Sequence, residues 1–193
     1  MKPKIAIIGR GTVGKSIQKG LDRVGYETRI VGNVPHEVNE ATRWAEILIL
    51  AVPFNAIDST IQEMGDAVNG KPLVDVSNIV SPEAQQSIPA FSCGAKELQR
   101  KAPRAKVVKA FNTVFAEQMS AGHTKNQQVS LFVAGDDNEA RAKTLQLARD
   151  IGFDAIDAGP LDNARYLEAM GNMIIQLAFR LGLGRDSAYK IIH

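Results

Sequence analysis

Short apolar runs alternate with amphipathic stretches along most of this chain. Runs rich in apolar residues at 4–8, 47–52 and 73–76 are typical of buried strands, and further strands are predicted at 28–31, 106–110, 129–133 and 154–156. In the 129–133 segment, apolar residues alternate with small or polar ones, which favours a position near a sheet edge. The alternation of strands with helices predicts an α/β fold of the Rossmann type, with a doubly wound, mainly parallel sheet.

Helical spacing of apolar residues fills the segments between these strands. Clear patterns start at Val13, Ile57 and Ala140, each with apolar or small residues recurring every three or four positions. The polar stretch containing Pro35 has room for barely two helical turns. Residues 81–94 contain two prolines and a glycine, which predicts a loop or a broken helix.

A long helical pattern begins at Pro160 and ends at Gly182 and Gly184. It is apolar over much of its circumference, so burial against more than one surface is expected. A homodimer contact and packing on the chain's own sheet both remain open. We therefore predict a dinucleotide-binding Rossmann domain at residues 1–158 and a short helical C-terminal segment at 159–193.

The glycine-rich segment after the first strand matches two phosphate-binding patterns. Gly9, Gly11 and Gly14 fit G-x-G-x-x-G, the dinucleotide fingerprint, while Gly9, Gly14, Lys15 and Ser16 fit the P-loop of nucleotide hydrolases. In either case, backbone N–H groups at the start of a helix would hold a phosphate.

The rest of the chain favours the dinucleotide interpretation. A P-loop enzyme needs an acidic residue at the end of a neighbouring apolar strand to hold Mg²⁺. The strongest apolar strand ends at Pro53 with no aspartate, and the apolar pattern continues beyond Asp75 through Val76. In a dinucleotide site, Lys15 and Ser16 are simply polar residues of the first helical turn.

The composition argues against a nucleic-acid-binding, membrane-spanning, secreted or metal-binding protein. The 193 residues suit one domain, apolar content is 45%, charged content is 23%, and the net charge of +2 does not indicate a nucleic-acid partner. No apolar stretch approaches the length of a membrane span, and the N-terminus has no signal-peptide pattern, so a cytoplasmic protein is expected. A single cysteine, Cys93, and three scattered histidines predict no metal site.

Six segments together resemble the coenzyme F420-dependent NADP oxidoreductase family: GRGTVG, ILILAVPF, LVDVSN, VVKAFNT, VAGDDNEA and IGFDAIDAGPLDNARYLE. The KAFNT element is similar also to the cytosolic oxidoreductase domain of STEAP metalloreductases. The resemblance implies a cytoplasmic, usually dimeric oxidoreductase that binds NADP(H) and passes a hydride between nicotinamide and a second ring, F420 or a flavin. It implies no catalytic side chain, because hydride transfer between stacked rings depends mostly on positioning.

The resemblance also places the cofactor along the chain. The predicted cofactor-binding residues are Gly9, Arg10, Gly11, Thr12, Val13, Gly14, Gly32, Asn33, Ala51, Val52, Pro53, Phe54, Ser77, Asn78, Ala110, Phe111, Asn112 and Thr113. The glycine loop would contact the pyrophosphate, and Ala110 to Thr113 would line the nicotinamide pocket. Judged without the resemblance, the residues favour a core aromatic at a strand end for Phe111 and a turn cap for Asn112.

One departure from the family concerns the choice of cofactor. Family members typically end the second strand with Ser-Arg or Asn-Arg, which holds the 2′-phosphate, whereas this chain has Gly32-Asn33-Val34. The carboxylate that would bind an NAD ribose is also missing from this position. We expect NADP(H) rather than NAD(H), with Arg10 supplying the missing charge. A non-catalytic redox sensor and a P-loop hydrolase are the alternative functions.

Overall fold

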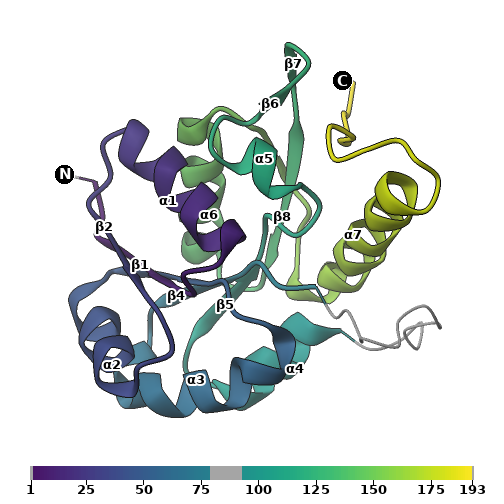
Figure 1. Ribbon diagram of the computed structural model, residues 1–193. Coiled ribbons are helices and arrows are strands. Elements are labelled where there is room, and N and C mark those ends of the chain that lie inside the picture. Colours follow the sequence, from purple (N-terminus) through teal and green to yellow (C-terminus); the bar gives the residue numbers. More distant parts are fainter. Residues whose placement is uncertain (1, 79–92, 193) are drawn as a thin grey trace.

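One seven-stranded sheet organises the protein (Figure 1). The computed structural model describes residues 2–78 and 93–192. Along the chain the strands of this sheet are β1 (Ile5–Ile8), β2 (Thr28–Val31), β3 (Ile47–Leu50), β4 (Pro72–Asp75), β5 (Lys106–Lys109), β8 (Ser130–Gly135) and β9 (Asp154–Asp157). Their order across the sheet is β2-β1-β3-β4-β5-β8-β9. The first five are parallel, β8 runs antiparallel to β5, and β9 is parallel to β8. The predicted Rossmann-type, mainly parallel sheet is confirmed.

Helices cover both faces of the sheet (Figure 1). The longer helices are α1 (Thr12–Arg23), α2 (Pro35–Trp44), α3 (Ile57–Met64), α4 (Gly94–Lys101), α6 (Asn138–Ile151) and α7 (Ala164–Phe179). One apolar core contains Ile17, Leu21 and Leu147 from α1 and α6, and the other contains Val38, Met64 and Leu98 from α2, α3 and α4. Strands β1, β3 and β4 lie between these cores and are buried along their whole length, as their apolar runs require.

Every predicted strand is present, whereas several helices differ from expectation. α2 has ten residues rather than barely two turns, with Pro35 in its first turn. α7 starts at Ala164, because Pro160 precedes a 3-10 turn (Leu161–Asn163) rather than the helix itself. α3 is followed by a 3-10 turn, Gly65–Val68, and another such turn, Phe54–Ala56, precedes it.

The sequence patterns missed three elements. These are α4, α5 (Ala116–Met119) and the hairpin of β6 (His123–Thr124) and β7 (Gln127–Gln128). The predicted loop at 81–94 falls outside the described residues except for Cys93 and Gly94, and Gly94 already begins α4. No helix in the described ranges is long and apolar enough to cross a membrane. The division of the chain at residue 158 stays a prediction.

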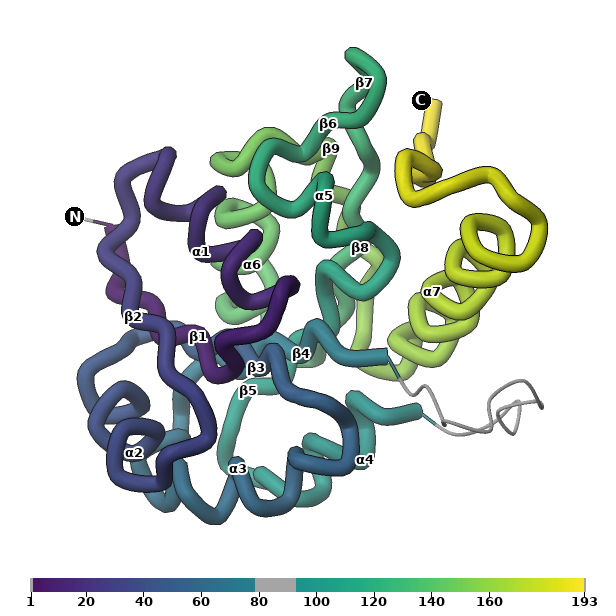
Figure 2. Tube along the Cα trace, in the orientation of Figure 1, coloured from purple at the N-terminus to yellow at the C-terminus, as the bar shows by residue number. Residues whose placement is uncertain are grey.

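The strand order places the expected cofactor cleft. After β1 the chain adds β2 on one side and then crosses back to add β3 on the other, so the topology switches between β1 and β3. Ligands of doubly wound folds bind outside the carboxyl ends of the strands at such a point. The loop from β1 into α1 lies beside β3 in the trace of Figure 2, which puts the three glycines at the switch point.

Candidate functional site

Close backbone contacts explain two of the three loop glycines. A Cβ on Gly9 would lie 2.1 Å from the carbonyl oxygen of Ala51, and the φ of Gly9 is +123°. A Cβ on Gly14 would lie 2.0 Å from the carbonyl oxygen of Gly9. Larger residues at these two positions would force apart β1, β3 and α1. At Gly11, by contrast, a Cβ would meet nothing within 4 Å, so packing alone does not require glycine there.

The start of α1 suits an anion. Gly11 is its N-cap, no side chain caps the helix, and the first turn contains no acidic residue. Backbone N–H groups of the first turn therefore lack both an intrahelical partner and a competing carboxylate. Thr12, which is exposed, and Val13, which is partly buried, form this first turn. A Cβ at Gly11 would meet no protein atom within 4 Å, and contact of this turn with a pyrophosphate stays a prediction.

The carboxyl end of β3 lies next to the glycine loop. The backbone N–H of Ala51 donates to the carbonyl of Ile8 at 2.8 Å, which continues the ladder between β1 and β3 past the end of the strands. Ala51, Val52 and Phe54 are partly exposed, and Pro53 is exposed. The structure thus brings these predicted residues next to the glycine loop.

Arg10 occupies the end of β2, where the adenosine ribose would lie. Its side chain passes over Gly32, because a Cβ there would lie 3.7 Å from Arg10 Cδ and 4.0 Å from Arg10 Nη1. Arg10 Nη2 donates to Glu37 Oε2 at 3.1 Å, and Arg10 Nε approaches the carbonyl of Ile30 at 3.5 Å. Asn33 is exposed beside this group. The structure therefore places a cation where the sequence lacks the usual arginine, but it also places a carboxylate there that we did not predict.

An amide pair joins the carboxyl ends of β4 and β5. Asn78 Nδ2 donates to the carbonyl of Asn112 at 3.0 Å, and Asn112 Nδ2 donates to Asn78 Oδ1 at 3.0 Å and to the carbonyl of Leu167 at 2.8 Å. Helix α7 packs on this pair through Gly171, where a Cβ would lie 2.5 Å from Asn78 Oδ1. Two predicted residues are thus brought together and held by α7.

The other predicted residues of the KAFNT segment are buried. Ala110 and Thr113 have no exposed surface, and Phe111 is 1% exposed with its ring edge-on to Phe153, 5.9 Å between centroids. Phe111 adopts a φ of +63°, which is rare for an aromatic residue. Asn112 Oδ1 and Thr113 Oγ1 have no hydrogen-bond partner among the described residues. Contact of this segment with a nicotinamide stays a prediction.

A buried ionic cluster lies directly beneath the amide pair. Lys109 Nζ is 2.8 Å from Asp75 Oδ2, 3.2 Å from Glu168 Oε1 and 2.6 Å from the carbonyl of Ser77. The side chains of Lys109 and Asp75 are fully buried, and that of Glu168 is nearly so. Burial opposes the charge on Lys109, but Asp75 and Glu168 hold the lysine pKa above its ordinary value. The ammonium group is therefore charged at neutral pH.

The same cluster fixes the start of α4 and the end of β4. Glu168 accepts hydrogen bonds from the backbone N–H groups of Gly94 and Ala95, at 3.0 and 3.1 Å. Asp75 Oδ1 accepts from the N–H and the hydroxyl of Ser77, at 2.9 and 2.7 Å. With Lys109 on its other oxygen, Asp75 is fully buried and both of its oxygens are already engaged by the protein, which argues against its use as a Mg²⁺ ligand of a P-loop enzyme.

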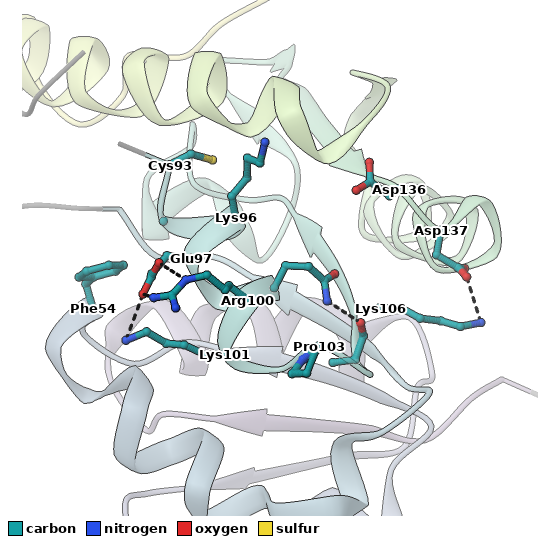
Figure 3. A pocket seen from close by; sticks show the side chains of 13 residues that line it. Phe54, Cys93, Lys96, Glu97, Arg100, Lys101, Pro103, Lys106, Asp136 and Asp137 are labelled. Carbon is teal, nitrogen blue, oxygen red and sulfur yellow. Dashed lines mark hydrogen bonds and ion pairs between the residues drawn. The ribbon is translucent and has the colours of Figure 1, made fainter. Parts of the chain in front are cut away.

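A separate cavity of about 1180 Å³ runs along α4 (Figure 3). Its charged residues pair with one another or with neighbours, as Arg100 does with Glu97 and Lys106 with Asp137. Among the described residues that line it, only Phe54 belongs to the predicted cofactor site. Apart from Phe54, this cavity therefore does not overlap the predicted cofactor residues, and the dinucleotide site at the glycine loop stays a prediction.

The sequence contained a signal for part of the ionic cluster. Asp75 and Lys109 are register partners at the ends of two adjacent apolar strands, so opposite charges at equivalent positions could have indicated a buried pair. No comparable signal marks Glu37 or Glu168, because each reaches its partner only through the tertiary fold.

Comparisons with known proteins show which sequences and which fold this chain resembles. The family model described as NADP oxidoreductase coenzyme F420-dependent matches residues 31–79. The chain is 31% identical to Metalloreductase STEAP3 of Rattus norvegicus over 182 residues, 87% of this chain and 36% of that protein. It is 27% identical to the F420-dependent NADP reductase of Methanocaldococcus jannaschii over 169 residues, 84% of this chain and 74% of that protein.

A solved structure agrees across the whole chain. The crystal structure of a candidate F420-dependent NADP reductase from Arthrobacter sp. FB24 superposes with a TM-score of 0.87 at 26% identity. The alignment covers 99% of this chain and 100% of that one. The resemblance predicted from the sequence motifs is confirmed. The chain spans only about a third of the length of the metalloreductase it matches.

Proposed function

We propose that this chain, which resembles the F420-dependent NADP oxidoreductase family in sequence and fold, is an NADP-dependent oxidoreductase. The observation that carries the proposal is the glycine loop, with its uncapped helix start at the topological switch point. The contacts at Gly9 and Gly14 bring the backbone of β1 and α1 close together, as a bound pyrophosphate requires.

The residues present fit an NADP molecule at both ends. At the adenosine end, Arg10 extends over Gly32 and offers a guanidinium to a 2′-phosphate. Toward the nicotinamide end, Asn78 and Asn112 form a fixed polar edge after β4 and β5. The absence of a side chain at Gly32 lets Arg10 lie close to the backbone at the adenosine end.

Hydride transfer makes few demands on side chains. Bound NADPH supplies a hydride, with its two electrons, to a ring acceptor stacked on the nicotinamide. The chain's contribution is to hold the two rings in contact and to exclude water. This role suits a site built from backbone groups, amides and a rigid ionic cluster. We propose F420 or a flavin as the acceptor, because relatives are named for F420-dependent reduction.

The outer side of α7 supports a homodimer. Its inner side buries Leu167, Ile174 and Ala178, whereas Tyr166, Met173 and Phe179 are more than half exposed. Exposed apolar residues of this size on one helix are typical of a protein–protein contact. Light scattering of the intact chain tests this, with Met173→Lys as the variant expected to become monomeric.

A thermal-shift panel with NADPH, NADH, ATP-Mg²⁺, FMN and F420 tests the proposed function. A ligand at about 100 times its Kd stabilises a fold by roughly 2.7 kcal/mol, which gives a clear rise in Tm. We expect NADPH to stabilise the protein, and NADPH oxidation with F420 or FMN to follow. Stabilisation by ATP-Mg²⁺ alone would contradict the proposal, and binding of NADPH without turnover would favour a redox sensor.

A further inference from the structure

Glu37 forms an ion pair with Arg10, the side chain to which the proposed function assigns the 2′-phosphate. It lies in the first turn of α2, and its Oε2 is 3.1 Å from Arg10 Nη2. The side chains of Arg10 and Glu37 are 54% and 37% exposed, so both are reachable by a ligand in the cleft. A phosphate bound by Arg10 would therefore have this carboxylate as a neighbour.

Arg10 provides a cation at the end of β2, and the residues that directly follow this strand add no charge. Gly32 has no side chain, and Asn33 is uncharged. The guanidinium of Arg10 lies over Gly32 on one side and meets Glu37 on the other. A dinucleotide phosphate and the Glu37 carboxylate would thus compete for the same N–H donors, and two like charges would be brought together.

The geometry points to Glu37 as a specificity-determining residue that weakens the preference for NADPH over NADH. The 2′-phosphate of NADPH has to share Arg10 with Glu37. The 2′-hydroxyl of NADH carries no charge and can donate a hydrogen bond to the same carboxylate, as acidic residues do in NAD-binding folds. The inference rests on the proposed function, because it concerns the same cofactor cleft.

Binding of NADPH and NADH to the intact chain tests this role at low and moderate salt. For Glu37→Gln, which keeps the size of the side chain and removes its charge, we expect the Kd for NADPH to fall by about three- to tenfold, and by less at higher salt. The Kd for NADH stays unchanged or rises. Glu40→Gln is the matched control, because Glu40 lies one turn further along α2 and pairs with His36 instead.

The double variant Arg10→Ala/Glu37→Gln distinguishes competition for Arg10 from direct repulsion between the Glu37 carboxylate and the phosphates of the cofactor. Arg10→Ala alone raises the Kd for NADPH more than that for NADH, and in its background Glu37→Gln loses most of its gain. Three results would overturn the role of Glu37. They are an equal gain in affinity for both cofactors in Glu37→Gln, a full gain in NADPH affinity when Arg10 is also replaced, and no gain in NADPH affinity at all. If the unaltered protein binds neither cofactor, the proposed function itself fails.

Discussion

Lys109 and Glu168 form a buried ion pair, with 3.2 Å between Nζ and Oε1, that joins α7 to the end of β5. Asp75 contacts the same ammonium group from β4 at 2.8 Å. One cation is therefore shared by two carboxylates, and the N–H groups at the start of α4 compensate part of the remaining negative charge. This arrangement ties two strands and two helices together directly below the proposed nicotinamide end.

Replacing Lys109 with methionine should strongly destabilise the fold. Removing one partner of a buried ion pair typically costs about 3–5 kcal/mol, because the remaining charge is left without compensation. In Lys109→Met, both Asp75 and Glu168 would lose the cation that compensates their charge. Urea unfolding of the variant measures the loss.

Two further variants distinguish loss of the charge balance from loss of packing. Lys109→Met/Glu168→Gln should be more stable than Lys109→Met, since one uncompensated charge is removed. The gain is partial, because Gly94 and Ala95 donate to different oxygens of Glu168 and the amide of glutamine keeps only one acceptor oxygen. Lys106→Met, at the partly exposed start of the same strand, should cost less than about 1 kcal/mol. Similar losses for Lys106→Met and Lys109→Met would show that the cluster has no special role.

The fold could be predicted well because its strands are encoded locally. Each buried strand of the parallel sheet is a run of apolar residues, as in Ile47–Leu50, and such runs need no tertiary information to be recognised. Helix α4 could not be found in this way. It is polar along most of its length, buries only Gly94, Ala95 and Leu98, and its first turn is satisfied by Glu168, 74 residues away from Gly94.

The hairpin after α5 did have a local signal. Lys125 and Asn126, between β6 and β7, both have positive φ, as the two-residue turns of tight hairpins require. Asparagine adopts positive φ more readily than most residues, so Asn126 is a partial signal, although the Asn-Gly or Asp-Gly pair that marks such turns most clearly is missing. The Arg10–Glu37 contact depends instead on how β2 leads into α2, and the sequence offers no pattern for it.

Two alanine substitutions in the glycine loop should have different effects. Gly14→Ala places a Cβ 2.0 Å from the carbonyl oxygen of Gly9, so both stability and NADPH binding should fall. Gly11→Ala meets no protein atom within 4 Å, so stability should change by less than about 1 kcal/mol, as expected for a helix N-cap. Its Cβ should still weaken NADPH binding, because it projects toward the expected pyrophosphate.

The comparison requires both measurements on both variants. Unfolding in urea without cofactor gives stability, and titration with NADPH gives affinity. If Gly11→Ala bound NADPH as tightly as the unaltered protein, the pyrophosphate would not lie over the start of α1.

Gly171→Ala should loosen the contact between α7 and the amide pair. Alanine normally stabilises a helix interior by about 1 kcal/mol relative to glycine. Here the added Cβ would lie 2.5 Å from Asn78 Oδ1 and 2.9 Å from Asn112 Nδ2, and overpacking of this kind typically costs about 1–3 kcal/mol. We expect a net loss in urea unfolding. Arg165→Ala, at an exposed position of the same helix, should leave stability nearly unchanged. A gain in stability for Gly171→Ala would show that α7 packs less closely on Asn78.

Asp137 should make the stability of the protein depend on acidic pH. It is the N-cap of α6 and accepts a hydrogen bond from the backbone N–H of Ala140 at 2.8 Å. This bond, together with nearby Lys106, holds the Asp137 pKa below its ordinary value of 3.8. Because the folded pKa is the lower one, the stabilisation is complete above the unfolded value and is lost as the pH falls through the folded value.

Asp137→Ala should therefore cost about 1 kcal/mol at pH 7, the usual value for a lost N-cap, and the difference from the unaltered protein should shrink toward pH 3. Asp137→Asn keeps a cap oxygen without the charge, so it should lie between the two at pH 7, and a pH-independent cost of Asp137→Ala would contradict the ionised cap.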